Sequence, residues 1–154
     1  MRMERVNRIW RHPYYQACLA EIRRLEAERK FCRHTPEHFL DVARITCLLA
    51  SEQGVQAGRE QIYAAGLLHD IGRHLQYRQK IPHEQASTAI AEEILRDCGF
   101  DGQERSSILR LILGHRTKPE DGEKTTLPGG QAVQKLFFLS GTGRVQLAGR
   151  KEKP

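Results

Sequence analysis

Apolar residues recur at three- and four-residue steps through most of the first 115 positions, which is the spacing of one face of a helix. Residues 13–31 begin with Pro13 and have a charged opposite face. Their apolar face consists of Tyr15, Cys18, Leu19, Ile22 and Leu25. We predict that this N-terminal segment, residues 1–32, is helical and packs on the remainder of the chain.

Further helices are predicted from starts, stops and apolar stripes. Thr35 and Pro36 form a favourable start, with a hydroxyl N-cap followed by proline in the first turn. The next helix covers about residues 57–71 and stops at Gly72, which we interpret as a C′ glycine. Two more helices are expected, from Pro82 to just before Gly99 and over about residues 102–115. The chain is therefore predicted to be all-α.

Each of the last four predicted helices carries a histidine in line with its apolar stripe. They are His38, His69, His83 and His115. A single histidine on such a face is usually a core residue with satisfied hydrogen bonds, but burying four requires several compensating partners. A metal centre accounts for all four together. Asp70 lies at the edge of the same face as His69.

We interpret the remaining histidines differently. His12, His34 and His74 fall near predicted helix ends or turns, so we expect them at the surface. His34 and Arg33 could also line the mouth of a pocket.

Four short motifs resemble those of the HD-domain superfamily of metal-dependent phosphohydrolases. They are HFLDVA at 38–43, LLHDIGRH at 67–74, IPHEQAS at 81–87 and LILGHR at 111–116. The resemblance covers roughly residues 33–116 and implies a compact helical bundle with a core of that extent. It implies that His38, His69 and Asp70 hold a first metal ion, and that His83 and His115 hold a second, with Asp70 bridging.

The resemblance also implies a cofactor and a reaction. Imidazoles and a carboxylate suit two iron, manganese or similar divalent ions. Two such ions activate a hydroxide and stabilise the phosphate oxygens that it attacks. Besides Asp70, Arg116 and Glu84 are candidate catalytic residues, for steadying phosphate and for acid–base chemistry. Arg73 and Lys118 are further candidates for steadying phosphate, although we favour their interpretation as solvated surface charges.

The sequence departs from the family after residue 116. The family uses one more aspartate on a later helix, but no aspartate follows Asp121. Residues 117–154 contain PGG and SGTG and show no sustained helical period, so we expect an irregular, aberrant or disordered tail. Reading the back-translated codons of 127–136 one base later permits the missing aspartate. We therefore hypothesise a frame-shifted end, which the nucleotide sequence can test.

Composition narrows the class of partner. The net charge is +6, and half of it lies in residues 117–154, so the body has no concentrated basic stripe for polymeric nucleic acid. The four cysteines lie far apart, without a CxxC pair, as in reduced cytosolic proteins. No apolar run approaches the roughly 18–20 residues that cross a bilayer. We expect a cytoplasmic protein with a small phosphorylated or nucleotide substrate and no membrane partner.

Two functions remain open at this point. The first is a metal-dependent phosphohydrolase acting on a nucleotide or another phosphate ester or anhydride. The alternative is a catalytically impaired HD-domain remnant, or a nucleotide-binding module, with an incomplete metal site.

Overall fold

The computed structural model describes residues 3–28, 34–115 and 130–142, and all regular structure in these ranges is α-helical. The N-terminal elements are α1 (Glu4–Arg11) and α2 (Pro13–Glu26). The central elements are α3 (Pro36–Glu52), α4 (Arg59–Leu68) and α5 (Arg73–Gln79). The last three are α6 (His83–Asp97), α7 (Gly102–Gly114) and α8 (Gly130–Thr142). The all-α prediction is confirmed.

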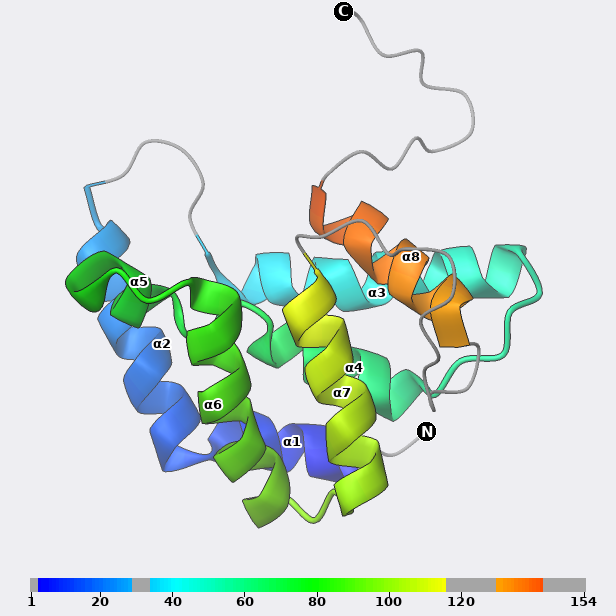
Figure 1. Ribbon diagram of the computed structural model, residues 1–154, viewed down its shortest axis with the longest axis horizontal. Helices are drawn as coiled ribbons and strands as arrows, with labels where there is room; N and C mark the ends of the chain where they lie inside the picture. The colour runs from blue at the N-terminus through cyan, green and yellow to red at the C-terminus, as the bar shows by residue number, and fades with distance from the viewer. Residues whose placement is uncertain (1–2, 29–33, 116–129, 143–154) are drawn as a thin grey trace, which may run out of the picture.

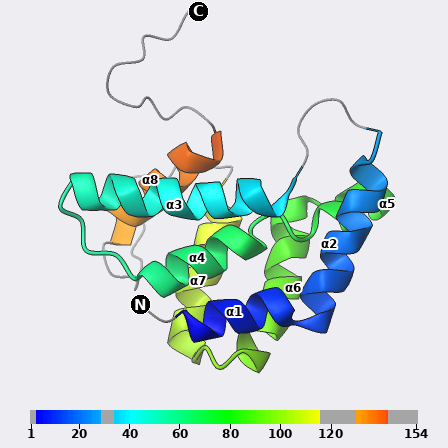
Figure 2. The same cartoon turned by 180° about the vertical axis from the view of Figure 1, so that it is seen from behind.

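Helix α4 is the centre of the bundle. It packs against α3, α7, α1 and α6, while α8 lies on α3 and also contacts α7. Figure 2 shows α3 along one edge, α1 along the opposite edge and α4 between them. Every residue of α4 from Ala64 to Leu68 is buried, so its C-terminal end lies in the core. None of the described helices is both long enough and apolar enough to span a membrane.

The helix starts follow the local sequence. Thr35 accepts a hydrogen bond from the backbone N–H of His38, with Pro36 in the first turn. Asp101 and Glu104 form a reciprocal capping box at the start of α7. At the start of α2, the His12 side chain accepts a hydrogen bond from the backbone N–H of Tyr14. These caps fix where the helices begin, and hence which residues face the centre.

The N-terminal segment packs on the bundle through both of its helices. Helix α1 contacts α4, and α2 contacts α5 (Figure 1). The buried Tyr15 hydroxyl donates to the backbone carbonyl of Leu67 at 3.0 Å. This bond ties α2 to the end of α4, immediately before His69.

The structure departs from expectation at Gly72. The helix predicted over 57–71 ends at Leu68, and Gly72 is the N-cap of α5 with φ −89°, so it is not a left-handed C′ glycine. A Cβ at this position would lie 2.4 Å from the backbone nitrogen of Ser87 and 2.7 Å from Ala86. Glycine is needed here for close approach to α6.

The second departure is α8, which occupies residues 130–142 of the segment expected to be irregular. Its buried face consists of Val133, Gln134, Leu136, Phe137 and Ser140. Ser140 and Thr46 of α3 form a buried hydroxyl–hydroxyl hydrogen bond at 3.0 Å. Packing against α3 outweighs the turn-forming residues that flank α8. The remainder of the tail lies outside the described residues.

Candidate metal centre

Asp70 lies in the turn between α4 and α5 and is 3% exposed. Leu68 and Ile71 on either side are fully buried, which draws the turn into the core. The backbone N–H of Gly72 donates to the Ser87 hydroxyl of α6 at 2.9 Å and fixes the far end of the turn. A carboxylate buried in this way requires charged or hydrogen-bonding partners.

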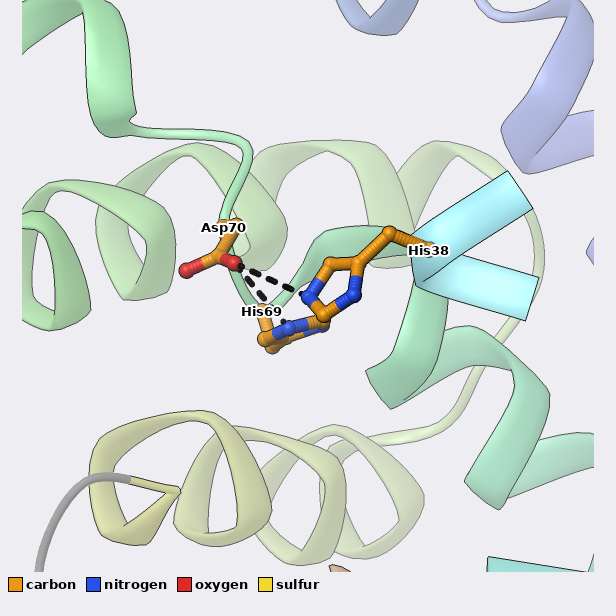
Figure 3. Close-up of side chains that lie close together, drawn as sticks. All are labelled: His38, His69 and Asp70. Carbon is orange, nitrogen blue, oxygen red and sulfur yellow. Dashed lines mark ion pairs between the residues drawn. The ribbon is translucent and has the colours of Figure 1, made fainter. Parts of the chain in front are cut away.

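One carboxylate oxygen of Asp70, Oδ2, faces three histidines. It lies 3.2 Å from His69 Nε2, 3.8 Å from His38 Nε2 and 3.7 Å from His34 Nε2. Figure 3 shows the side chains of His38 and His69 converging on this oxygen from two different elements. We call His34, His38 and His69 the Oδ2 group.

The other oxygen, Oδ1, faces a second set of nitrogens. His83 Nε2 lies 3.3 Å away and His115 Nε2 lies 3.5 Å away. We call these two residues the Oδ1 group. Nε of Arg73 also lies 3.3 Å from Oδ1, and its side chain is 16% exposed. The expectation of a solvated Arg73 is therefore corrected, because the i, i+3 spacing places it beside Asp70.

Hydrogen bonds at Nδ1 assign the tautomers of three of the histidines. His69 donates from Nδ1 to the Gly66 carbonyl at 2.7 Å, and His83 donates to Gln76 Oε1 at 2.8 Å. His115 donates from Nδ1 to the Ile112 carbonyl. In the neutral imidazole, a proton on Nδ1 leaves a lone pair on Nε2, which is a metal-ligating atom.

The Oδ1 group provides a direct test of whether a metal fits. Nε2 of His83 and Nε2 of His115 face each other at 3.1 Å, and both lie close to Oδ1. Two lone pairs and a carboxylate oxygen at this separation repel one another unless a proton or a metal ion lies among them. Bonds of about 2.0–2.2 Å from one ion bring its ligand atoms within about 3–4 Å of each other. The donor set therefore fits a cation.

Two sets of residues among the described ones have the spacing to hold a metal ion. They are His38, His69 and Asp70, and Asp70, His83 and His115. These are the five residues expected from the sequence, and Asp70 is common to both sets. The structure brings them together from α3, α6, the end of α7 and the turn after α4.

Electrostatics favour the ionised form of Asp70. Burial opposes ionisation, but in the metal-free chain a protonated His69, a hydrogen bond from His115 and the charge of Arg73 outweigh it and hold the pKa of Asp70 well below its usual value. Burial lowers the pKa of His38, whereas the Asp70 carboxylate outweighs burial and raises the pKa of His69, so a metal ion would displace a proton there. An ionised carboxylate and a neutral imidazole are the forms that bind metal.

Aromatic packing holds the His69 ring in place. Phe39 of α3 and Phe137 of α8 each contact it edge-to-face, with ring centroids at 5.6 Å and 5.8 Å. His69 is 1% exposed, so its ring has little freedom to reorient. Helix α8 thus contributes to the site through Phe137.

Of the candidate catalytic residues Glu84 and Arg116, the structure describes only Glu84. Glu84 Oε2 lies 3.4 Å from His83 Nδ1, and both residues line a pocket of about 380 Å³. Gln76, Lys80 and Pro82 complete the lining of that pocket. Arg116 lies outside the described residues, as do Lys118 and Arg33.

The three histidines expected at the surface are more enclosed than the sequence suggested. His74 is 8% exposed and donates from Nδ1 to the Ile71 carbonyl. His12 is partly buried and pairs with Asp97 at 2.8 Å. His34 belongs to the Oδ2 group, which no apolar stripe predicted because His34 precedes the start of α3. Its position four residues before His38 was the available signal.

Comparison with known proteins agrees with this architecture. The family model of the HD domain matches residues 35–135, which extends into α8. An uncharacterized protein of Clostridium beijerinckii is 41% identical over 119 residues, covering 77% of this chain and 76% of the relative. No solved structure gives a significant match.

Other relatives are much longer proteins. Ribonuclease Y of Thermosipho melanesiensis is 34% identical over 97 residues, covering 63% of this chain and 17% of the enzyme. Ribonuclease Y of Geobacter metallireducens is 28% identical over 130 residues, covering 84% of this chain and 22% of the enzyme. This chain therefore spans only about a fifth of the ribonucleases it resembles.

Proposed function

This chain belongs to the HD domain family, and on that premise we propose that it is a metal-dependent phosphohydrolase. Its substrate would be a nucleotide or another phosphate ester or anhydride. The observation that carries the proposal is the division of the Asp70 carboxylate, with the Oδ2 group on one oxygen and the Oδ1 group on the other. Such a carboxylate is suited to bridging two divalent ions.

Each residue has a role in this proposal. His38 and His69 would hold one ion, His83 and His115 would hold the other, and Asp70 would contact both. When bound, iron, manganese or similar ions would lower the pKa of water and stabilise negative charge on phosphoryl oxygens. Carbonyl groups and Gln76 fix the ring orientations in advance, so that little reorganisation accompanies binding.

The pocket beside His83 is our proposed entrance for the substrate. Its volume of about 380 Å³ is within the range for small-molecule sites. Lys80 would attract the phosphate, and Glu84 would exchange a proton with the attacking or departing oxygen. Arg116, next to His115 in the sequence, would add positive charge. A pocket of this size favours a small nucleotide over polymeric RNA.

Hydrolysis assays test this function. The purified protein, supplied with Mn²⁺ or Fe²⁺, would be assayed on an aryl phosphodiester, a dinucleotide and a nucleoside triphosphate. We expect turnover of at least one, and a fall in kcat/KM of about 100-fold or more in Asp70→Asn and His69→Ala. His12→Ala is the matched control. His12 also pairs with a carboxylate, but it belongs to neither group around Asp70.

The alternative is a module that binds metal or nucleotide without hydrolysis. The observation in its favour is that no aspartate follows Asp121 to supply the family's later ligand. Metal content distinguishes the alternatives. A wild-type protein that binds two ions but hydrolyses none of the substrates above the buffer blank would contradict the phosphohydrolase and support the binding module.

A further inference from the structure

His34 approaches Asp70 as closely as a residue that the family motif identifies as a ligand. Its Nε2 lies 3.7 Å from Asp70 Oδ2, compared with 3.8 Å for His38 Nε2. Its side chain is 10% exposed, whereas that of His38 is 38% exposed. His34 is thus the more enclosed of the two, although it precedes α3 and has no place in the motif.

A buried carboxylate fixes the orientation of the His34 ring. His34 Nδ1 donates to Glu26 Oε2 at 2.6 Å, and the His34 backbone N–H donates to Glu26 Oε1 at 2.7 Å. Glu26 is the last residue of α2 and is 3% exposed. The hydroxyl of Tyr77, on α5, also donates to Oε2. With its proton on Nδ1, His34 presents the Nε2 lone pair to Asp70.

We propose that His34 is a further protein ligand in the Oδ2 group, with Glu26 and Tyr77 as the positioning residues that orient it. This inference rests on the proposed function. A carboxylate that accepts from the second nitrogen of a ligating histidine fixes its tautomer and makes it a better ligand. His34 would supply a donor to an ion that otherwise lacks the family's later aspartate.

His12 shows what a purely structural histidine–carboxylate pair looks like in the same chain. Its Nε2 contacts Asp97, and its Nδ1 accepts from the backbone N–H of Tyr14. Both ring nitrogens are engaged, and no lone pair remains for a metal. The two histidines flank opposite ends of α2, which at 14 residues is about 21 Å long. His12→Ala is therefore a control for loss of a paired imidazole.

The test is metal binding by the 154-residue chain after its metal has been removed with a chelator. Mn²⁺ would be titrated while free Mn²⁺ is followed by electron paramagnetic resonance, and Co²⁺ would be added separately to record its visible absorption. We expect His34→Ala to weaken one of two sites by about 10- to 100-fold, to leave the other unchanged and to alter the Co²⁺ spectrum. Tyr77→Phe should shift the same site in the same direction by a smaller factor.

The outcomes separate the two proposals. If the wild type binds two ions and His34→Ala has the same affinities and the same Co²⁺ spectrum, His34 is not a ligand. That result would leave the proposed function standing. A wild type that binds neither metal overturns both. If His34→Ala does not fold, His34→Gln replaces it, since glutamine retains a hydrogen-bonding side chain of similar reach. An effect in His12→Ala equal to that in the His34 variants also overturns the inference.

Discussion

Gly72 lies where the turn that carries Asp70 packs against the backbone of α6. Its φ is ordinary for any residue, and the constraint is the backbone of Ser87 and Ala86 directly above its Cα. A side chain here would separate Asp70 from the helix that carries His83. A substitution at Gly72 would therefore lower the stability of the fold and also disturb the geometry of the Oδ1 group.

We expect Gly72→Ala to lower the free energy of unfolding by about 1–3 kcal/mol, as overpacking does in a well-packed core. It should also weaken metal binding at the Oδ1 group more than at the Oδ2 group. Urea denaturation and metal titration measure the two effects. Gly102→Ala is the control, because its Cβ would meet only the Arg105 side chain at 3.8 Å. Equal stabilities for the two variants would contradict the steric explanation.

At the scale of elements, α8 reaches the site through the side chain of Phe137. Phe137 is 1% exposed and packs on the His69 ring, while Leu139 on the same helix is 39% exposed. We predict that Phe137→Ala costs about 3–5 kcal/mol of stability and also weakens metal binding, because a cavity beside His69 frees its ring. Thermal unfolding with and without Mn²⁺ measures both. Leu139→Ala should change the stability by only about 0.5 kcal/mol.

One side chain of α1, that of Arg5, forms ion pairs with two other helices. Arg5 makes a bidentate contact with Glu104 of α7, at 2.8 and 2.9 Å, and pairs with Glu60 of α4. The hydrogen bond from Arg5 outweighs burial and lowers the pKa of Glu104 in the folded protein. A lowered carboxyl pKa contributes stability that is present above the unfolded-state pKa. That contribution is lost as the pH falls through the folded-state value.

We therefore expect Arg5→Gln to destabilise the protein by about 1 kcal/mol at neutral pH and by less below pH 4. Urea midpoints at pH 7 and pH 3.5 test this. Arg24→Gln is the matched control, because its pair with Glu21 is exposed and lies within one helix. A penalty for Arg5→Gln that is the same at both pH values would argue against the ion pair as its cause.

At the scale of the molecule, metal binding and folding should be coupled. The candidate ligands come from separate segments, and their geometry exists only in the folded chain. At a Mn²⁺ concentration of 100 times Kd, one site adds about 2.7 kcal/mol, which raises Tm by about 5–10 °C in a chain of this size. Differential scanning calorimetry measures the shift, and EDTA should reverse it. A Tm that rises equally in Asp70→Asn would point to binding elsewhere.

The sequence predicted those parts of the molecule that follow a regular period. The five expected ligands lie in line with apolar helical stripes or motif positions, and the structure brings them together. His34 was missed because it lies before the start of α3, where no period applies. The role of Gly72 depends on contact with α6, and the face of α8 was obscured by flanking glycines. In all three cases the structure depends on contacts between segments far apart in the sequence, which a local pattern does not reveal.

The residues of the candidate metal centre are widely spaced along the chain, which affects when each becomes available during protein synthesis. The Oδ2 group and Asp70 lie within residues 34–70, whereas the Oδ1 group requires His115 at the end of α7. A growing chain on the ribosome therefore contains every donor of one group long before the last donor of the other has been translated. The order of translation thus limits assembly, because the second half of the centre cannot close until α7 has left the exit tunnel.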